Sequence, residues 1–253
     1  MAKNWIDAQK NEKIFWKNIY INNIQDDIYT QTNKYGWINF TRHVLDRNHL
    51  NLKFLNGKKI LDLGSGPGGV AKGIHELIKN SEIKNSKIIA VDPLMDFYKN
   101  EIGLLIEDDF LSLLSNKGEK LEISDNSIDI VFSTNVLDHC DNPAKIVDEV
   151  YRVLKPGGKF YPSLHLVYSY LSLFTPYIKY FDTNHPYHLT LSMVEKSFVK
   201  KFVKVKVLNK YPISHDQKNF TFLNIFKGNS RIRSLKRFLS KFVLFTCYFE
   251  CEK

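Results

Sequence analysis

The chain has 253 residues, a formal net charge of +9 at pH 7 and a hydrophobic content of 43%. This length suits one domain with a full core, and the composition excludes a disordered chain. No run of roughly 18 apolar residues is present, so no membrane span is expected, and the polar N-terminus lacks a signal-peptide core. Three scattered cysteines predict neither a disulfide nor a metal site and favour a reducing cytoplasm.

The first 55 residues predict helices. Along the first helix, helical spacing is shared by Trp5, Ala8, Gln9, Glu12, Phe15, Trp16 and Ile19, of which the apolar members form a broad face. We expect this face to pack on the domain or to cap a ligand site. A second helix is predicted from Thr41 to Leu55, ending near Asn56-Gly57.

A glycine turn follows, in the stretch from Lys59 to Gly69, which reads KILDLGSGPGG. The apolar run predicts a buried strand, and the residues from Gly69 to Lys79 predict a helix. Glycines in the turn allow the backbone to approach a ligand, and the helix would present its first amides to that ligand. Because Gly64, Gly66 and Gly69 also have the GxGxxG spacing, the turn alone does not separate a methyl-donor site from a dinucleotide site.

Strands and helices then alternate, which predicts a parallel sheet covered on both faces. Strands are expected at 87–92, 128–134, 159–165, 202–208 and 244–250, and the third strand at either 104–107 or 118–121. Helices are expected at 94–101, 143–154, 192–200 and, amphipathic and basic, 231–243.

Four linked motifs resemble the class I S-adenosylmethionine-dependent methyltransferases. They are the glycine turn after Asp62, the acidic end of the second strand at Asp92, the SxDxV strand from Ser127, and the RVLKPGG turn from Arg152. The resemblance implies one doubly wound, Rossmann-like α/β domain with a mostly parallel seven-stranded sheet and an antiparallel last strand. It divides residues 1–253 into a helical cap (1–55), a cofactor-binding core (56–165), an aromatic acceptor-side insertion (166–190) and a segment completing the sheet (191–253).

The resemblance also implies that the donor is S-adenosylmethionine and the product S-adenosylhomocysteine. It further indicates which residues would bind each part of the donor. Asp62 and the turn residues Gly64, Ser65, Gly66 and Gly68 would hold the amino-acid end. Asp92, followed by Pro93 and Leu94, would hold the ribose, and Asn135 and Val136 would adjoin the donor after the fourth strand. The adenine contact would come from Glu119 and Lys120, with Asp108-Asp109 as the rival pair.

Histidines are the candidates for a base on the acceptor side. His139 holds the family position just after the fourth strand, while His165, His185 and His188 lie in or beside an aromatic-rich segment. A neutral imidazole can take a proton from a hydroxyl near neutral pH. The alternative is that His139 only ties its loop to the backbone and that the others are surface residues. Asp129, Arg152 and Lys155 are predicted to be structural.

A narrower resemblance, carried by residues 91–98, 118–121 and 135–139, is to methyltransferases of bacterial capsule and surface-polysaccharide pathways. It implies an oxygen acceptor on a small molecule, nucleotide or glycan precursor, including phosphoramidate types. Between Lys196 and Phe249 there are thirteen Lys or Arg residues and one acid, which leaves open an RNA methyltransferase or peripheral membrane contact through 231–243. A non-catalytic cofactor-binding subunit also stays open. Asp62 and the RVLKPGG turn disfavour a nicotinamide-dependent dehydrogenase.

Overall fold

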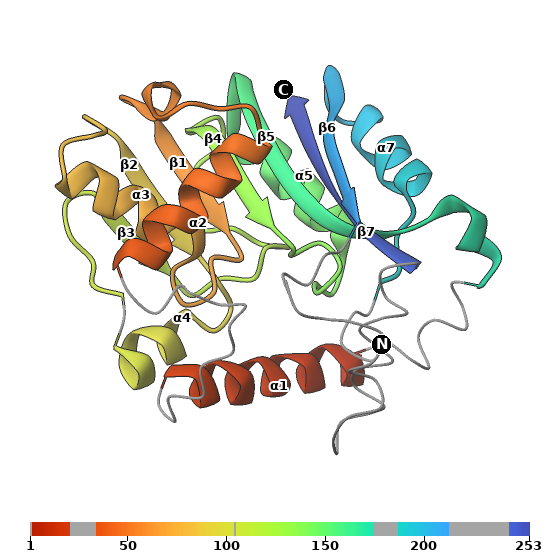
Figure 1. Cartoon of the computed structure of the whole chain (residues 1–253), viewed down its shortest axis with the longest axis horizontal. Helices are drawn as coiled ribbons and strands as arrows, with labels where there is room; N and C mark the ends of the chain where they lie inside the picture. Colours follow the sequence, from red (N-terminus) through yellow and green to blue (C-terminus); the bar gives the residue numbers. More distant parts are fainter. Residues whose placement is uncertain (1, 21–33, 104, 175–186, 213–242) are drawn as a thin grey trace, which may run out of the picture.

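A seven-stranded sheet organises the computed structural model, which describes residues 2–20, 34–103, 105–174, 187–212 and 243–253. The strands lie in the order β3-β2-β1-β4-β5-β7-β6 (Figure 1). Their bounds are Lys59–Leu63 (β1), Lys87–Val91 (β2), Leu111–Leu114 (β3), Ile128–Thr134 (β4), Leu154–Val167 (β5), Lys204–Pro212 (β6) and Leu244–Glu252 (β7).

Only β7 runs against its neighbours. β1 pairs in parallel with β2 and β4, β2 with β3, and β4 with β5, whereas β7 is antiparallel to both β5 and β6. The predicted architecture, a Rossmann-like sheet with an antiparallel last strand, is therefore confirmed. The carboxyl ends of the parallel strands meet at one edge, which is where such sheets bind ligands.

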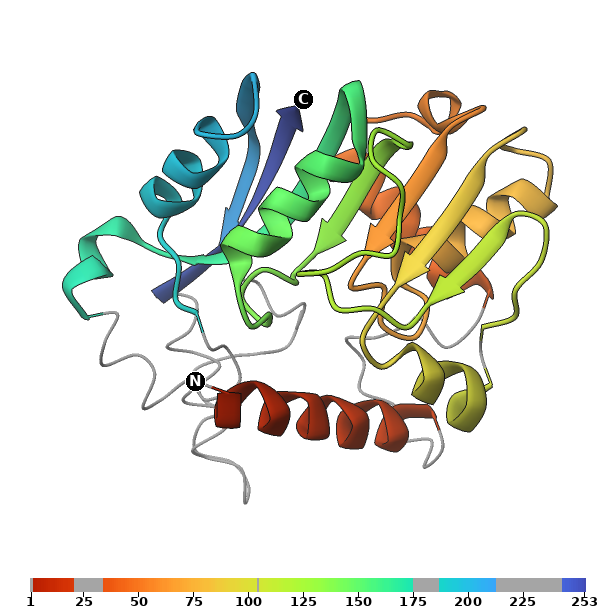
Figure 2. The ribbon, with the colours of Figure 1, turned by 180° about the vertical axis from the view of Figure 1, so that it is seen from behind.

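Helices cover both faces of the sheet (Figures 1 and 2). Their bounds are Ala2–Tyr20 (α1), Lys34–Arg47 (α2), Gly69–Lys79 (α3), Met95–Phe97 (α4), Pro143–Val153 (α5) and Leu191–Val199 (α7), with shorter turns at Leu52–Leu55 (η1), Tyr98–Ile102 (η2) and Ser169–Phe174 (η3). Ile60 packs in the cluster with α2 and α3, and its neighbour Leu61 in the cluster with α5 and α7. This alternation explains why β1 is apolar on both sides.

Two of the predicted elements were wrong. The third strand lies at Leu111–Leu114, not at either predicted position, because a strand of four residues is too short for its alternation to stand out from neighbouring apolar stretches. The second helix runs from Lys34 to Arg47 instead of Thr41 to Leu55, and His49, with a φ of +57°, breaks the helical path before η1. The remaining predicted strands match to within a few residues, although β5 is longer than expected. The predicted helix at 231–243 lies outside the described residues, apart from its last position.

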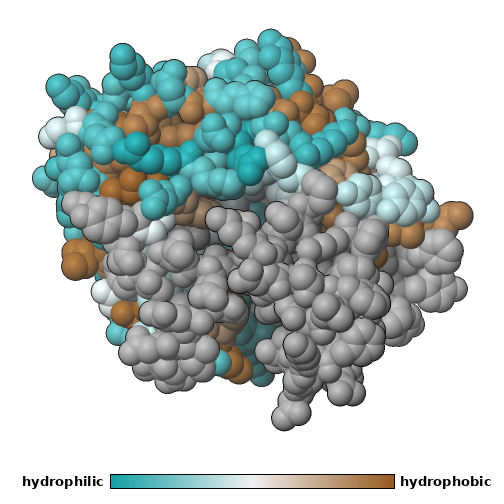
Figure 3. Space-filling model, in the orientation of Figure 1, coloured by the Kyte–Doolittle hydropathy of each residue, from teal (hydrophilic) through white to brown (hydrophobic). Residues whose placement is uncertain are grey.

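Helix α1 lies across the carboxyl ends of the strands rather than on a face of the sheet (Figures 1 and 2). None of the described helices is long and apolar enough to cross a membrane. The described part of the face in Figure 3 mixes hydrophilic and hydrophobic residues over α2 and the strands behind it. The three cysteines, Cys140, Cys247 and Cys251, are buried free thiols, and burial raises the pKa of each.

Candidate donor and acceptor site

The glycine turn is fastened to the end of β2. The amides of Gly64 and Ser65 donate to the carbonyl of Val91 over 2.7 and 3.1 Å. Gly64 has a φ of +71°, and a Cβ there would collide with the Val136 side chain. Glycine at this position therefore lets the loop after β4 close onto the turn, where the Val136 side chain lies against Gly64.

Gly66 faces open space on the outer side of the turn. Its φ is +54°, and among the described residues the only heavy atom within 4 Å of a Cβ built there, apart from its chain neighbours, is Trp16 Cζ2, at 4.0 Å. A side chain at this position would project into the gap between the turn and α1. The turn thus forms a cradle that a ligand can enter and a larger residue would fill.

Asp62 is buried beneath the first turn of α3. Its exposed fraction is 2%, and its Oδ2 accepts a hydrogen bond from the Ala71 amide at 2.7 Å. Burial raises the pKa of Asp62 to about 7 against the opposing backbone hydrogen bonds, and the charge of Asp92 raises it further. A carboxylate in this state gains from a cationic or hydrogen-bond-donating ligand.

Asp92 lies on the other side of the turn, at the end of β2. Its Oδ2 accepts from the Gly66 amide at 3.0 Å and its Oδ1 from the Leu94 amide at 2.8 Å. Burial raises the pKa of Asp92 to about 6, those hydrogen bonds lower it, and the charge of Glu12 raises it. Asp62, Gly66 and Asp92 thus form one assembly, in which Asp92 holds the turn.

The residues around the turn fit S-adenosylmethionine. Besides the two buried carboxylates, Ser65 Oγ and Asn135 Oδ1 are buried and have no hydrogen-bond partner among the described residues. Unpaired buried acceptors are costly unless a ligand supplies donors. The ammonium and ribose hydroxyls of the donor are such groups, and its net positive charge suits the carboxylates.

The candidate adenine residues are placed differently from one another. Glu119 Oε1 accepts from the amides of Asp141 and Asn142 at 2.8 and 2.9 Å, so it braces the loop before α5. Asp108 precedes the amino end of β3 and pairs with His75 at 2.7 Å, away from the glycine turn. The structure therefore separates the rival Asp108-Asp109 pair from the turn. Lys120 is exposed in the turn that carries Glu119.

The loop after β4 joins the donor side to the acceptor side. Asn135 adopts a φ of +58°, and its amide donates to the Ser163 carbonyl at 2.9 Å. His139 Nε2 lies 3.4 Å from Asn135 Nδ2, and the His139 amide donates to the Val136 carbonyl. A single hydrogen-bonded turn therefore joins His139 to Val136, the residue that lies against Gly64.

The segment carrying His188 is tied to this same loop. The Tyr187 amide donates to the Asp138 carbonyl at 3.4 Å, and its hydroxyl donates to the Asp141 carbonyl at 2.6 Å. His139 and His188, far apart in sequence, thus lie on adjoining segments. His165 instead pairs with Thr246 on β7, with Nδ1 3.0 Å from Oγ1. His185 lies outside the described residues.

Comparison with known proteins agrees with this geometry. Residues 61–161 match the methyltransferase domain family. This part of the chain, from β1 into β5, is similar to methyltransferase domains. A malonyl-[acyl-carrier protein] O-methyltransferase of Marinomonas is 33% identical over 144 residues, 54% of this chain and 47% of its own length. The chain spans well under two thirds of the first curated relatives that it matches, at 38% and 47%.

Two solved structures share the fold of this chain. One is a complex between the Haloferax volcanii Trm112 methyltransferase activator and a methyltransferase, with 17% identity, 97% of this chain and 96% of that chain covered, and a TM-score of 0.58. The other is a Haemonchus contortus phosphoethanolamine N-methyltransferase in complex with phosphomonomethylethanolamine and S-adenosylhomocysteine. Its identity is 22%, its coverage 88% of this chain and 58% of that chain, and its TM-score 0.57.

Three charged residues have the structural role predicted from the sequence, namely Asp129, Arg152 and Lys155. Asp129 accepts from the Lys59 amide and from Lys155 Nζ, both at 2.8 Å. Arg152 donates to the carbonyls of Leu121 and Ile123 and pairs with Glu149, which fixes the long connection before β4 against α5.

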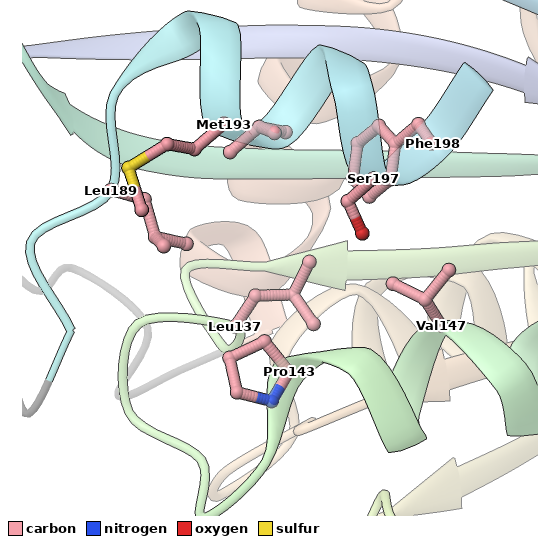
Figure 4. Close-up of a pocket in the computed structure, with 8 residues that line it drawn as sticks. Leu137, Pro143, Val147, Leu189, Met193, Ser197 and Phe198 are labelled. Carbon is pink, nitrogen blue, oxygen red and sulfur yellow. The ribbon is translucent and has the colours of Figure 1, made fainter. Parts of the chain in front are cut away.

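An apolar crevice lies between α5 and α7 (Figure 4). Pro143 and Val147 line it from α5 and Leu137 from the loop after β4, and the α7 side is lined by Leu189, Met193, Val194, Ser197 and Phe198. None of these is a residue of the glycine turn or either site carboxylate, so the crevice is distinct from the donor site. It adjoins the acceptor side through Leu137, which precedes Asp138 and His139.

Three features around the turn and the β4 loop were not predicted from the sequence. The charge of Glu12 in α1 raises the pKa of Asp92, and the Trp16 ring lies 4.0 Å from a Cβ built on Gly66. The signal was available, because Gln9 and Glu12 interrupt an otherwise apolar helix face. Asp138, 1% exposed in the β4 loop, was also missed, and its sequence neighbourhood gives no signal that separates it from His139.

Proposed function

We propose that the protein transfers the methyl group of S-adenosylmethionine to an oxygen of a small-molecule, nucleotide-linked or glycan-precursor acceptor. The acceptor class includes phosphate or phosphoramidate groups of capsule or surface-polysaccharide precursors in the cytoplasm. The observation that supports donor use most directly is the buried Asp62–Asp92 pair on either side of the glycine turn, with hydrogen-bond acceptors beside it that lack donors.

The donor supplies an already activated methyl group, so the protein has to align the acceptor, exclude water and, for a hydroxyl, take a proton. His139 is the base that we propose. It follows Val136, which packs on Gly64, and Tyr187 brings the acceptor-side segment to its loop. His185 and His188 remain the alternative candidates for this base.

The choice of an oxygen acceptor is supported by His139 and by the resemblance to capsule methyltransferases. The curated relatives do not decide it, because their names span malonyl-[acyl-carrier protein] O-methylation, phosphoethanolamine N-methylation and arsenite methylation. Three free buried thiols agree with a reducing compartment.

A labelled-methyl assay tests the proposal. The protein is incubated with methyl-labelled S-adenosylmethionine and, separately, with a nucleotide-sugar and glycan-precursor extract, with total RNA, and with no acceptor. We expect label in the first pool only, on an oxygen identified by mass spectrometric fragmentation, and none with the Asp92→Ala variant. Label in RNA would favour the nucleic-acid alternative. Donor binding without label in any pool would favour the non-catalytic subunit.

A further inference from the structure

Helix α1 is fixed at both ends across the donor side of the sheet. Near its start, the Trp5 ring contacts Lys117, a residue of the loop after β3, whose Nζ lies 3.7 Å from the ring centre. Near its end, Lys17 pairs with Glu101 of η2 at 3.9 Å. Between these anchors the helix passes over the glycine turn (Figures 1 and 2).

The middle of α1 presents polar groups as well as an aromatic ring toward the site. Gln9, Glu12 and Trp16 are spaced three and four residues apart and so share one helix face. The Trp16 indole is 8% exposed and donates to Glu12 Oε1 at 2.7 Å. Gln9 Oε1 is buried with no hydrogen-bond partner among the described residues.

This face is unlike an ordinary packing face, which would be apolar. It places an unpaired amide oxygen and a carboxylate above a turn that already holds two buried carboxylates. The space between them is the one that a side chain on Gly66 would enter, with the Trp16 ring on its far side. Acceptors and an aromatic face on one side of such a space suit a ligand that is cationic and rich in hydrogen-bond donors.

We propose that Gln9, Glu12 and Trp16 of α1 form the outer wall of the donor pocket. The Trp16 ring packs against the bound donor, and Gln9 and Glu12 accept its hydrogen bonds or balance its positive charge. This inference rests on the proposed use of S-adenosylmethionine. The same contacts then slow release of the donor.

Calorimetry and stopped-flow dissociation on the full chain test the wall. The variants are Trp16→Ala, Trp16→Phe, Glu12→Gln and Gln9→Ala, with Ile14→Ala as the matched control because Ile14 is 59% exposed on the same helix. Glu12→Gln keeps an oxygen for the Trp16 indole and removes only the charge. The ligands are S-adenosylmethionine and S-adenosylhomocysteine, which differ in the sulfonium charge.

We expect Trp16→Ala to raise the Kd for S-adenosylmethionine by about tenfold or more and to speed its dissociation. Trp16→Phe, which keeps an aromatic ring, should bind and release the donor nearly as the wild type does. Glu12→Gln should raise the Kd for S-adenosylmethionine more than the Kd for S-adenosylhomocysteine. Gln9→Ala should raise the Kd for S-adenosylmethionine a few-fold. If Trp16→Ala and Glu12→Gln bind and release both ligands like Ile14→Ala, the wall does not exist. If Trp16→Ala fails to fold, Glu12→Gln and Gln9→Ala decide by the same criterion. Failure of the wild type to bind either ligand would instead refute the proposed function.

Discussion

The two sides of the site are built by different means. On the donor side, the backbone holds nearly everything: amides of Gly66, Ala71 and Leu94 fix the two carboxylates, and the Val91 carbonyl fixes the turn. On the acceptor side, contacts join segments distant in sequence, such as Tyr187 and Asp141. The donor side is thus specified locally and suits one constant ligand, whereas the acceptor side can change ligand by changing a few side chains.

The first test concerns the cradle and should have the largest effect. Gly66→Val is expected to abolish measurable donor binding in calorimetry, because the side chain enters the ligand space. Gly57→Val is its control: Gly57 has a similar φ of +68° and open space around it, but lies before β1. Both variants should lose about 1–2 kcal/mol of stability from backbone strain. Equal donor binding by the two would remove the turn from the site.

His139 provides the corresponding test on the acceptor side. His139→Gln is expected to lower the turnover of a hydroxyl acceptor by at least about 100-fold, the range for loss of a general base, while the donor Kd stays unchanged. His165→Gln, which alters a histidine paired with Thr246, is the control. A turnover loss shared by both variants, or a donor Kd raised in His139→Gln, would contradict the division between the two sides.

Asp92→Ala should weaken S-adenosylmethionine binding by more than about tenfold. Charge-assisted hydrogen bonds to the ribose, each worth roughly 1.5–3 kcal/mol, would be lost together with the anchor of Gly66. Calorimetry measures the change, with His139→Gln as the unaffected reference. An unchanged dissociation constant would exclude Asp92 from the donor site.

The effect of pH should be smaller and should act in opposite directions on binding and stability. With pKa values of about 7 for Asp62 and about 6 for Asp92, donor affinity should fall several-fold as the pH drops through this range. Both values lie above the ordinary 3.8, so the stability from these groups is fully present below about 3.8 and is lost as the pH rises through 6 to 7. Calorimetry and thermal unfolding across pH 5 to 8, with Asp92→Asn as reference, would test both signs.

The basic C-terminal region should show the smallest effect. Its described lysines are exposed, and Lys204, Lys206 and Lys210 line the edge strand β6, where charge discourages pairing with another sheet. Replacing these three with glutamine should leave donor binding unchanged and RNA binding weak at physiological salt. Tight RNA binding that this variant loses would overturn the choice of acceptor. Arg231, Arg233, Lys236 and Arg237, which invite the same test, lie outside the described residues.

The donor side could be predicted from the sequence because its determinants are contiguous. One stretch from Lys59 to Gly69 carries the strand, the turn and Asp62, and the next strand ends in Asp92. The placement of Trp16 over Gly66 could not be predicted, because a helix pattern does not say which part of the sheet the helix crosses. The third strand was missed for another reason: it has only four residues, and its position is fixed by pairing with β2, which the sequence pattern does not reveal. Which histidine serves the acceptor depends on contacts such as that of Tyr187, which sequence spacing does not encode.

The buried thiols give the protein internal reporters of opening. A thiol reacts with a labelling reagent only as an exposed thiolate, so burial and a raised pKa make Cys140, Cys247 and Cys251 silent in the closed state. Cys140 lies in the loop before α5, while Cys247 and Cys251 lie within β7, between two strands of the sheet. Their labelling rates would therefore separate local opening at the acceptor loop from opening of the sheet as a whole, without any engineered probe.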